Sequence, residues 1–98
     1  MIYVDAPTWK KHGGRKLYSH MVADTYEELH AFAVQIGVKP HFFHRAKNKH
    51  YDITTEQQQA AVLAGALLVD TRTIIRVARK ADEFETSPTV NRSPAADQ

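Results

Sequence analysis

Residues 24–37, DTYEELHAFAVQIG, carry the strongest secondary-structure signal in the chain and predict an α-helix. Thr25, followed three positions later by Glu28, forms a capping box that satisfies free amides of the first turn. Gly37 provides the left-handed residue that commonly ends a helix. Apolar side chains recur at helical spacing and predict one buried face, made of Tyr26, Leu29, Phe32, Ala33 and Ile36.

Two strands are predicted before this helix and a second helix after it. Residues 1–5 and residues 16–23 are rich in β-branched, aromatic and other apolar side chains, which is typical of strands. The second helix begins at Thr54 or Thr55, because each of them starts a capping box. It ends at Gly65, where the chain can again adopt a left-handed conformation.

The remaining signals complete the expected fold class. Residues 66–69, ALLV, predict a short buried strand. Residues 72–81 predict a third helix, capped by Asp70 or Thr71. Residues 50–53 are a candidate for one extra strand within an otherwise irregular segment. The fold class is therefore α/β (α+β): a single-layer sheet of three or four strands covered by about three helices, in the order β-β-α-loop-α-β-α.

Length and composition predict one small domain. The chain has 98 residues, close to the commonest domain size. We expect the domain to cover residues 1–81 and a flexible tail to cover residues 82–98, which lack periodicity and hold both Ser-Pro dipeptides. The absence of Cys excludes disulfides, thiolate zinc sites and cysteine nucleophiles. Because there is no signal peptide and no apolar run of membrane length, we expect a cytoplasmic protein without membrane contact.

Charge is unevenly distributed along the chain. The net charge is +2, with twelve Lys and Arg against seven Asp and Glu in residues 1–81 and one against four in residues 82–98. A basic body favours anionic partners, either phosphorylated small molecules or nucleic acid, although it also serves solubility. The third helix adds a row of cations, Arg72, Arg76, Arg79 and Lys80, which would contact phosphates or would simply be solvated. A homo-oligomer remains an open alternative.

Five polar residues occur at the ends of predicted strands and helices, where α/β proteins bind ligands. His20, His50 and Asp52 are the candidate catalytic residues. Asp5 and Asp24, together with His50 and Asp52, are candidate ligands for a divalent metal cofactor. In an extended segment the side chains of His50 and Asp52 point the same way, so the imidazole and the carboxylate could share a metal ion, a phosphate or a proton. Histidine with carboxylate suits Mn, Zn or Fe, whereas Mg prefers carboxylates.

Each of these five residues also has a structural alternative. Asp5 could cap the turn that follows it, and Asp24 could be the N-cap of the first helix. His20 could be a core histidine with one satisfied nitrogen. Asp52 could cap the second helix and leave His50 in solvent.

Residues 41–53, HFFHRAKNKHYDI, are too polar for a core strand and too aromatic for an ordinary loop. We interpret them as one wall of a ligand pocket. Arg45 within this stretch, and Arg15 and Lys16 in the loop before the second strand, are candidate phosphate ligands. Tyr51 is a candidate ligand-binding residue that could stack on a nucleobase.

Several short motifs carry a resemblance to a known family. They are Tyr3-Val4-Asp5, His20 through Asp24, Glu27 through Gly37, His50-Tyr51-Asp52 and Ala61 through Ala66. With these motifs the chain resembles domain-of-unknown-function family 4031, an uncharacterised bacterial and phage family, over roughly residues 2–80. The resemblance implies a bacterial cell or phage-infected host and implies no activity.

The sequence leaves more than one function open. The first is a metal-dependent hydrolase, in which a metal-bound water attacks a phosphodiester or a nucleotide. The second is a non-catalytic binder of a nucleotide-like anion or of a partner protein, with a sequestration or accessory role. The third is a nucleic-acid-binding accessory protein that uses the basic face of the third helix. If the five polar residues converge in space, the first function is favoured; if they serve as caps and core hydrogen-bond partners, only binding or scaffolding is left.

Overall fold

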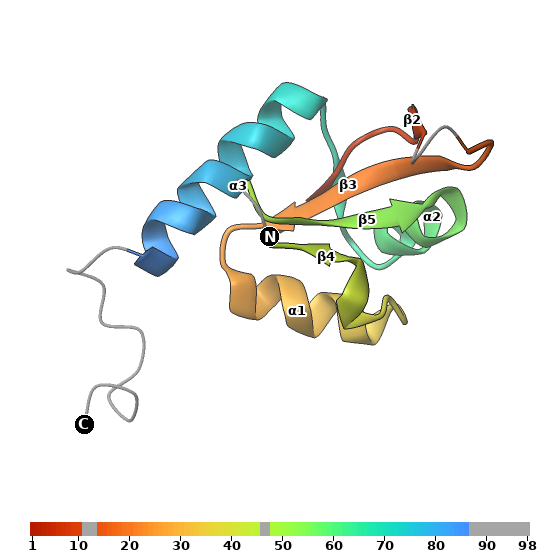
Figure 1. The fold of residues 1–98 in the computed structure, drawn as a ribbon. Coiled ribbons are helices and arrows are strands. Elements are labelled where there is room, and N and C mark those ends of the chain that lie inside the picture. Colours follow the sequence, from red (N-terminus) through yellow and green to blue (C-terminus); the bar gives the residue numbers. More distant parts are fainter. Residues whose placement is uncertain (11–13, 46–47, 87–98) are drawn as a thin grey trace.

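The computed structural model describes residues 1–10, 14–45 and 48–86, which form one sheet with helices on both faces (Figure 1). In these residues the strands are β1 (Ile2–Val4), β2 (Trp9–Lys10), β3 (Leu17–Ala23), β4 (Phe43–His44), β5 (His50–Thr54) and β6 (Leu67–Leu68). The helices are α1 (Tyr26–Gln35), α2 (Thr55–Leu63) and α3 (Thr71–Thr86), and a 3-10 turn covers Pro40–Phe42. This confirms the α+β class, with a sheet of six described strands in place of three or four.

Strand β3 lies at the centre of the sheet. The strand order is β4-β5-β3-β1-β6, and β2 pairs separately with β3. β3 is antiparallel to β1, β2 and β5, whereas β6 is parallel to β1. The register sets His20 opposite Asp52 and Met21 opposite Tyr51. Because successive side chains alternate between faces, the first pair lies on one face of the sheet and the second pair on the other.

The two faces carry cores of different size. Helices α1 and α2 cover the larger core, whose buried residues include Val4, Met21, Leu29, Tyr51, Ile53 and Ala61. On the other face a small core joins Val22 of β3 to Ile74 and Ala78 of α3. Figure 1 shows α3 and α1 on opposite sides of the sheet. The small core leaves room beside it, on the α3 face, for polar side chains.

The predicted N-caps are present at α1 and α2, but the capping box expected at α1 is only half formed, because the Glu28 carboxylate contacts the terminal amine of Met1. The Thr25 hydroxyl accepts a hydrogen bond from the Glu28 amide at 3.2 Å, and Gly37, just after the helix, has a φ of 81°. At α2 the capping box is reciprocal, because the Thr54 hydroxyl and the Gln57 side chain each accept from the other's backbone amide. Sequence-local hydrogen bonds therefore set where both helices begin.

Two expectations about the C-terminal half need correction. Strand β6 was expected to be buried, but Leu67 and Leu68 are 46% and 60% exposed because β6 is an edge strand with one neighbour. Helix α3 continues to Thr86, five residues into the segment expected to be a tail. Within this extension the Asp82 carboxylate accepts hydrogen bonds from the Tyr26 hydroxyl and from Lys49, both at 2.8 Å, which connects this part of α3 to the rest of the domain. Residues 87–98 lie outside the described residues.

The helices that the structure describes include none with the length and apolarity needed to cross a membrane.

Candidate functional site

Asp5 is the first polar residue after β1, and its side chain is buried against β3. Its Oδ1 accepts the backbone amide of His20 at 2.7 Å, and its Oδ2 contacts the His20 Nδ1 at 2.8 Å. The Thr71 hydroxyl, at the start of α3, donates to the same Oδ2 at 2.9 Å. The carboxylate therefore joins β1, β3 and α3 at one point.

The protonation states of this group follow from its donors. Burial alone would raise the pKa of Asp5, but the hydrogen bonds from His20 and Thr71 outweigh it and hold that pKa below its ordinary value. An ionised carboxylate only accepts hydrogen bonds, so the Nδ1 of His20 must carry a proton. The Nε2 of His20 is then the nitrogen with a lone pair available for a ligand.

His50 and Asp52 share the α3 face of β5 because they are two residues apart in a strand. The His50 Nε2 lies 3.1 Å from the Asp52 Oδ1. The His50 Nδ1 is 2.8 Å from the backbone carbonyl oxygen of Asn48, so this nitrogen is the donor. The backbone of Asn48, which provides this carbonyl, has a left-handed φ of 59°, a conformation that is uncommon for residues other than Gly.

His44 approaches the same carboxylate from the next strand. β4 pairs His44 with His50, and the two imidazole rings are stacked 5.1 Å apart with an angle of 4° between their planes. The His44 Nε2 contacts the Asp52 Oδ2, while the His50 Nε2 faces the Asp52 Oδ1. The Asp52 side chain is fully buried, whereas His44 is 43% exposed. A buried carboxylate thus lies between two imidazoles.

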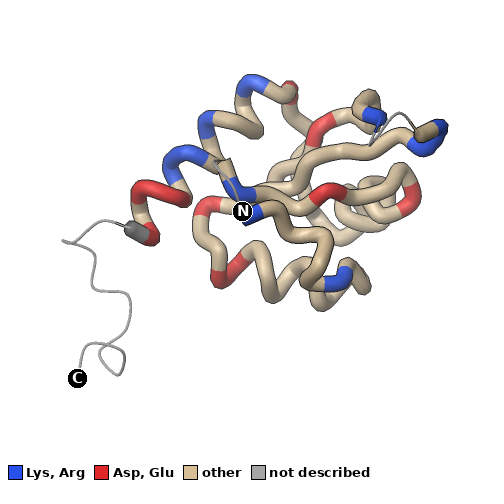
Figure 2. The backbone as a smooth tube through the Cα atoms, in the orientation of Figure 1, with Lys and Arg blue, Asp and Glu red and all other residues tan. Residues whose placement is uncertain are grey.

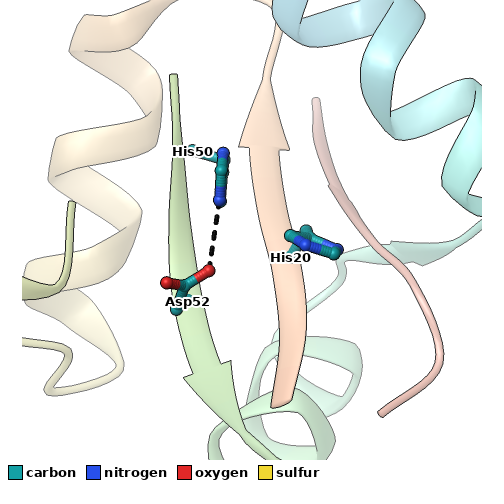
Figure 3. A group of neighbouring side chains, drawn as sticks. All are labelled: His20, His50 and Asp52. Atoms are coloured by element: carbon teal, nitrogen blue, oxygen red, sulfur yellow. Dashed lines mark ion pairs between the residues drawn. The ribbon is translucent and has the colours of Figure 1, made fainter. Parts of the chain in front are cut away.

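His20, His50 and Asp52 together form a compact set of metal-ligand atoms. One ring nitrogen of each histidine and one carboxylate oxygen lie within 4.8 Å of one another. Figure 3 shows His50 and Asp52 on β5 and His20 on the neighbouring strand β3. Two imidazoles and one carboxylate are a ligand set that suits Fe, Mn or Zn and leaves further coordination positions open.

A cavity of about 180 Å³ opens beside this set, between the sheet and α3. Its polar wall comes from His20, Asn48 and His50, and its α3 wall from Thr71, Ile74, Ile75 and Ala78. Trp9 of β2 covers His20 from another side, with ring centroids 5.4 Å apart, and is 37% exposed. The site therefore has a mixed polar and apolar pocket large enough for a small ligand group.

The structure does not bring Asp24 or Tyr51 to this pocket. Asp24 follows the far end of β3, where its carboxylate is 3.4 Å from the terminal amine of Met1 and accepts a hydrogen bond from the Tyr3 hydroxyl. Tyr51 points to the opposite face of the sheet, is 2% exposed and contacts the His30 Nδ1 through its hydroxyl at 2.7 Å. Tyr51 therefore contributes to the main core and is unable to stack on a ligand at this pocket.

The cations expected to bind phosphate lie on the surface and do not line the cavity. Arg15 and Lys16 are exposed in the loop before β3. Arg45 is exposed after β4, with its guanidinium 5.7 Å from the centre of the Phe43 ring. Any contact of these three residues with a phosphorylated ligand stays a prediction.

Sequence reasoning missed the residues that orient the two histidines. Thr71 was considered only as a helix cap, yet its hydroxyl binds Asp5. Asn48 acts through its backbone carbonyl, a group that every residue has, so its side-chain type does not predict this contact. His44 was not among the candidate site residues, although it contacts Asp52 on the next strand. All three contacts depend on which strands and helices become neighbours.

Metal-free protein is expected to lose stability as the pH rises through the pKa of His50. Burial would lower this pKa, but the contacts with Asp52 and with the Asn48 carbonyl raise it above the ordinary value of 6.5. A raised folded-state pKa means that protonation stabilises the fold fully below about pH 6.5, and that this stabilisation disappears at higher pH. Urea unfolding across this range should show the decline, and His50→Gln should remove it. If the stability of His50→Gln declined equally with pH, the decline would come from a titratable group other than His50.

Comparison with known proteins gives a single result. A family model described as "Protein of unknown function (DUF4031)" matches residues 2–81, which is most of the chain and includes every residue of the site. This confirms the resemblance drawn from the sequence motifs. No curated protein and no solved structure matches the chain.

Proposed function

This chain belongs to DUF4031, a family of proteins of unknown function, and we propose that it is a hydrolase that uses a divalent metal ion to cleave phosphate esters. The metal ligands in this proposal are His20, His50 and Asp52, and the substrate enters the cavity below α3. The family description carries no activity, so the proposal rests on the geometry of the site.

The observation that carries the proposal is the orientation of the two imidazoles. The Nδ1 of His20 is held by the Asp5 carboxylate, and the Nδ1 of His50 by the carbonyl of Asn48. In metal sites the second nitrogen of a ligating histidine is held in this way, by a carboxylate or a backbone carbonyl, which fixes the tautomer. Both histidines thus have the tautomer that leaves Nε2 for a metal ion.

A second argument concerns charge. The Nε2 of His50 and the Oδ1 of Asp52 are 3.1 Å apart, and each has a lone pair when the imidazole is neutral. Such a contact is favourable only if a cation lies between the two atoms, either a proton or a metal ion. A fully buried carboxylate such as Asp52 also needs a positive partner, because an isolated buried charge is very costly.

The chemistry of a bound cation suits phosphate esters. A divalent metal polarises a phosphoryl oxygen and lowers the pKa of a bound water toward neutrality. His44 contacts the other oxygen of Asp52 and is partly exposed, so its imidazole lies between the buried carboxylate and solvent. The apolar side chains of Ile74 and Ala78 limit the access of bulk water.

The proposal is tested by melting metal-free protein with added Zn, Mn, Fe(II) or Mg. At a ligand concentration of 100 times the dissociation constant, binding stabilises by about 2.7 kcal/mol, which corresponds to about 10 °C or more for a domain of this size. His50→Ala should abolish this rise. His41→Ala is the matched control, because His41 lies on the exposed 3-10 turn and contacts Phe42 and not the cluster.

Catalysis is tested with a nitrophenyl phosphodiester and the metal that gives the largest rise in melting temperature. Hydrolysis should require that metal and should be lost in His20→Ala and His50→Ala but not in His41→Ala. An unchanged melting temperature with every metal contradicts the proposal. Metal binding without hydrolysis would favour the alternative, a non-catalytic binder of a nucleotide-like anion.

A further inference from the structure

The outer face of α3 carries a row of arginines that the proposed metal site does not use. Arg72, Arg76 and Arg79 are spaced by four and three residues, so they share one exposed face, opposite the buried Ile74 and Ala78. Figure 2 shows this concentration of positive charge along the helix. Within the described part of the chain, none of the three guanidinium groups forms an ion pair with a carboxylate. The charges of Arg72 and Arg76 act on the nearby Asp70 carboxylate, but without an ion pair, so the guanidinium groups can still contact an external anion.

This row lines a hollow in the surface. The hollow has a volume of about 420 Å³ and is bounded by Arg72, Ile75, Arg76 and Arg79. Ile75 also lines the cavity beside His20 and His50, so the two spaces share this side chain as a common wall. A ligand in the arginine hollow thus lies next to the proposed metal site.

The spacing of the arginines favours a chain of phosphates over a single phosphate. With a rise of 1.5 Å per residue, Arg72 and Arg79 are separated by about 10 Å along the helix axis. One phosphate group could be reached by all three only if the long side chains bent toward one point, whereas successive phosphates of a polymer can each be contacted by an extended arginine. Arginine also binds phosphate oxygens in pairs through its planar fork, which lysine cannot do.

Two exposed apolar side chains favour a single strand. Ile75 is 40% exposed between the arginines, and Trp9 is 37% exposed above His20. Proteins that bind single-stranded nucleic acid combine a positive groove with aromatic or apolar surfaces on which unpaired bases stack. The metal cavity is also recessed between α3 and the sheet, where a paired and stacked duplex would not fit.

We infer that Arg72, Arg76 and Arg79 bind the phosphodiester backbone of single-stranded nucleic acid and hold it beside the metal site. This inference rests on the proposed function for what happens at the metal, and it names the substrate class of that site. The binding itself requires no metal ion, so it can be measured separately from catalysis.

The experiment is a salt titration of the binding of a fluorescein-labelled oligodeoxythymidine, in EDTA, by fluorescence anisotropy. Arg72→Gln/Arg76→Gln should weaken binding by about 10-fold or more, and should reduce the slope of log affinity against log salt by about 1.4, because each lost phosphate contact changes it by about 0.7. Lys80→Gln is the matched control, since it removes one positive charge from the same helix outside the hollow, and binding should change less than twofold.

Three results would overturn the inference. They are the absence of measurable binding at low salt, an equal loss in Lys80→Gln and in the double variant, and tighter binding of the duplex with oligodeoxyadenosine than of the single strand. The proposed function fails separately, because metal-dependent melting is measured without nucleic acid. Strand binding in EDTA without any metal effect would support the arginine surface and contradict the hydrolase.

Discussion

Asp5→Asn is expected to weaken metal binding by about 10- to 100-fold, the usual effect of losing a group that orients a ligating histidine. Asparagine keeps the shape of the side chain but replaces one oxygen by an NH₂ group. Asp5 accepts from both the backbone amide and the Nδ1 of His20, so the new NH₂ group must face one of these two donors. The backbone amide nitrogen always carries its proton, whereas the imidazole can carry its proton on either Nδ1 or Nε2.

The expected response is a change of tautomer at His20. The Nδ1 would become the acceptor and the proton would move to Nε2, which blocks the nitrogen proposed to bind the metal. Nitrogen-15 NMR of the histidine side chains distinguishes the two tautomers directly, and calorimetric titration gives the metal affinity. Asp24→Asn is the matched control, because Asp24 is an exposed carboxylate remote from the cluster. If Asp5→Asn changed the tautomer and left the affinity intact, His20 would not be a metal ligand.

Asp52→Leu is expected to abolish metal binding and also to stabilise the metal-free protein. The Asp52 carboxylate is fully buried between His44 and His50, and His50 loses its proton as the pH rises through its raised pKa. Replacing a buried ion pair with apolar side chains of similar volume commonly stabilises a protein by about 1–4 kcal/mol, and removing Asp52 has the same effect only where His50 is neutral, so that no charge is left unpaired. We expect such a gain at about pH 8, where a neutral His50 no longer compensates the buried charge.

Urea unfolding of metal-free wild type and Asp52→Leu at about pH 8 and about pH 5.5, on either side of the ordinary histidine pKa, measures this effect. The gain should be larger at the higher pH, because protonated His50 stabilises the wild type at the lower pH. Ile53→Ala is the comparison: it truncates the next residue of β5 in the main core and should cost about 2–5 kcal/mol at both pH values. A comparable loss in Asp52→Leu would assign Asp52 a structural role.

The parts of the fold with local signals could be predicted from the sequence. The start of α1 at Thr25 and of α2 at Thr54 follows from hydrogen bonds between residues three positions apart. The exposure of β6 and the length of α3 depend on partners far along the chain. Asp82, for example, is connected to the domain by hydrogen bonds from Tyr26 and Lys49, and no sequence pattern near Asp82 predicts those partners.

The same distinction applies to the candidate site. Convergence of Asp5, His20, His50 and Asp52 was expected from their positions in strands, and the structure brings these four together. Asp24 was grouped with them because it ends the same strand as His20, but four residues of extended chain separate the two by about 13 Å. The pattern also held the reason to exclude Tyr51, since a residue between two others in a strand faces the opposite way.

β5 alternates between the metal cluster on one face and the main core on the other. An insertion or deletion of a single amino acid within His50–Thr54 would exchange these two roles for the residues on one side of the change, so that a residue of the cluster would face the hydrophobic interior or a core residue would face the pocket. The register of this strand is therefore constrained both by the metal cluster on one face and by the packing of the main core on the other. Among natural variants we expect length changes to spare β5 and to accumulate in the neighbouring loops.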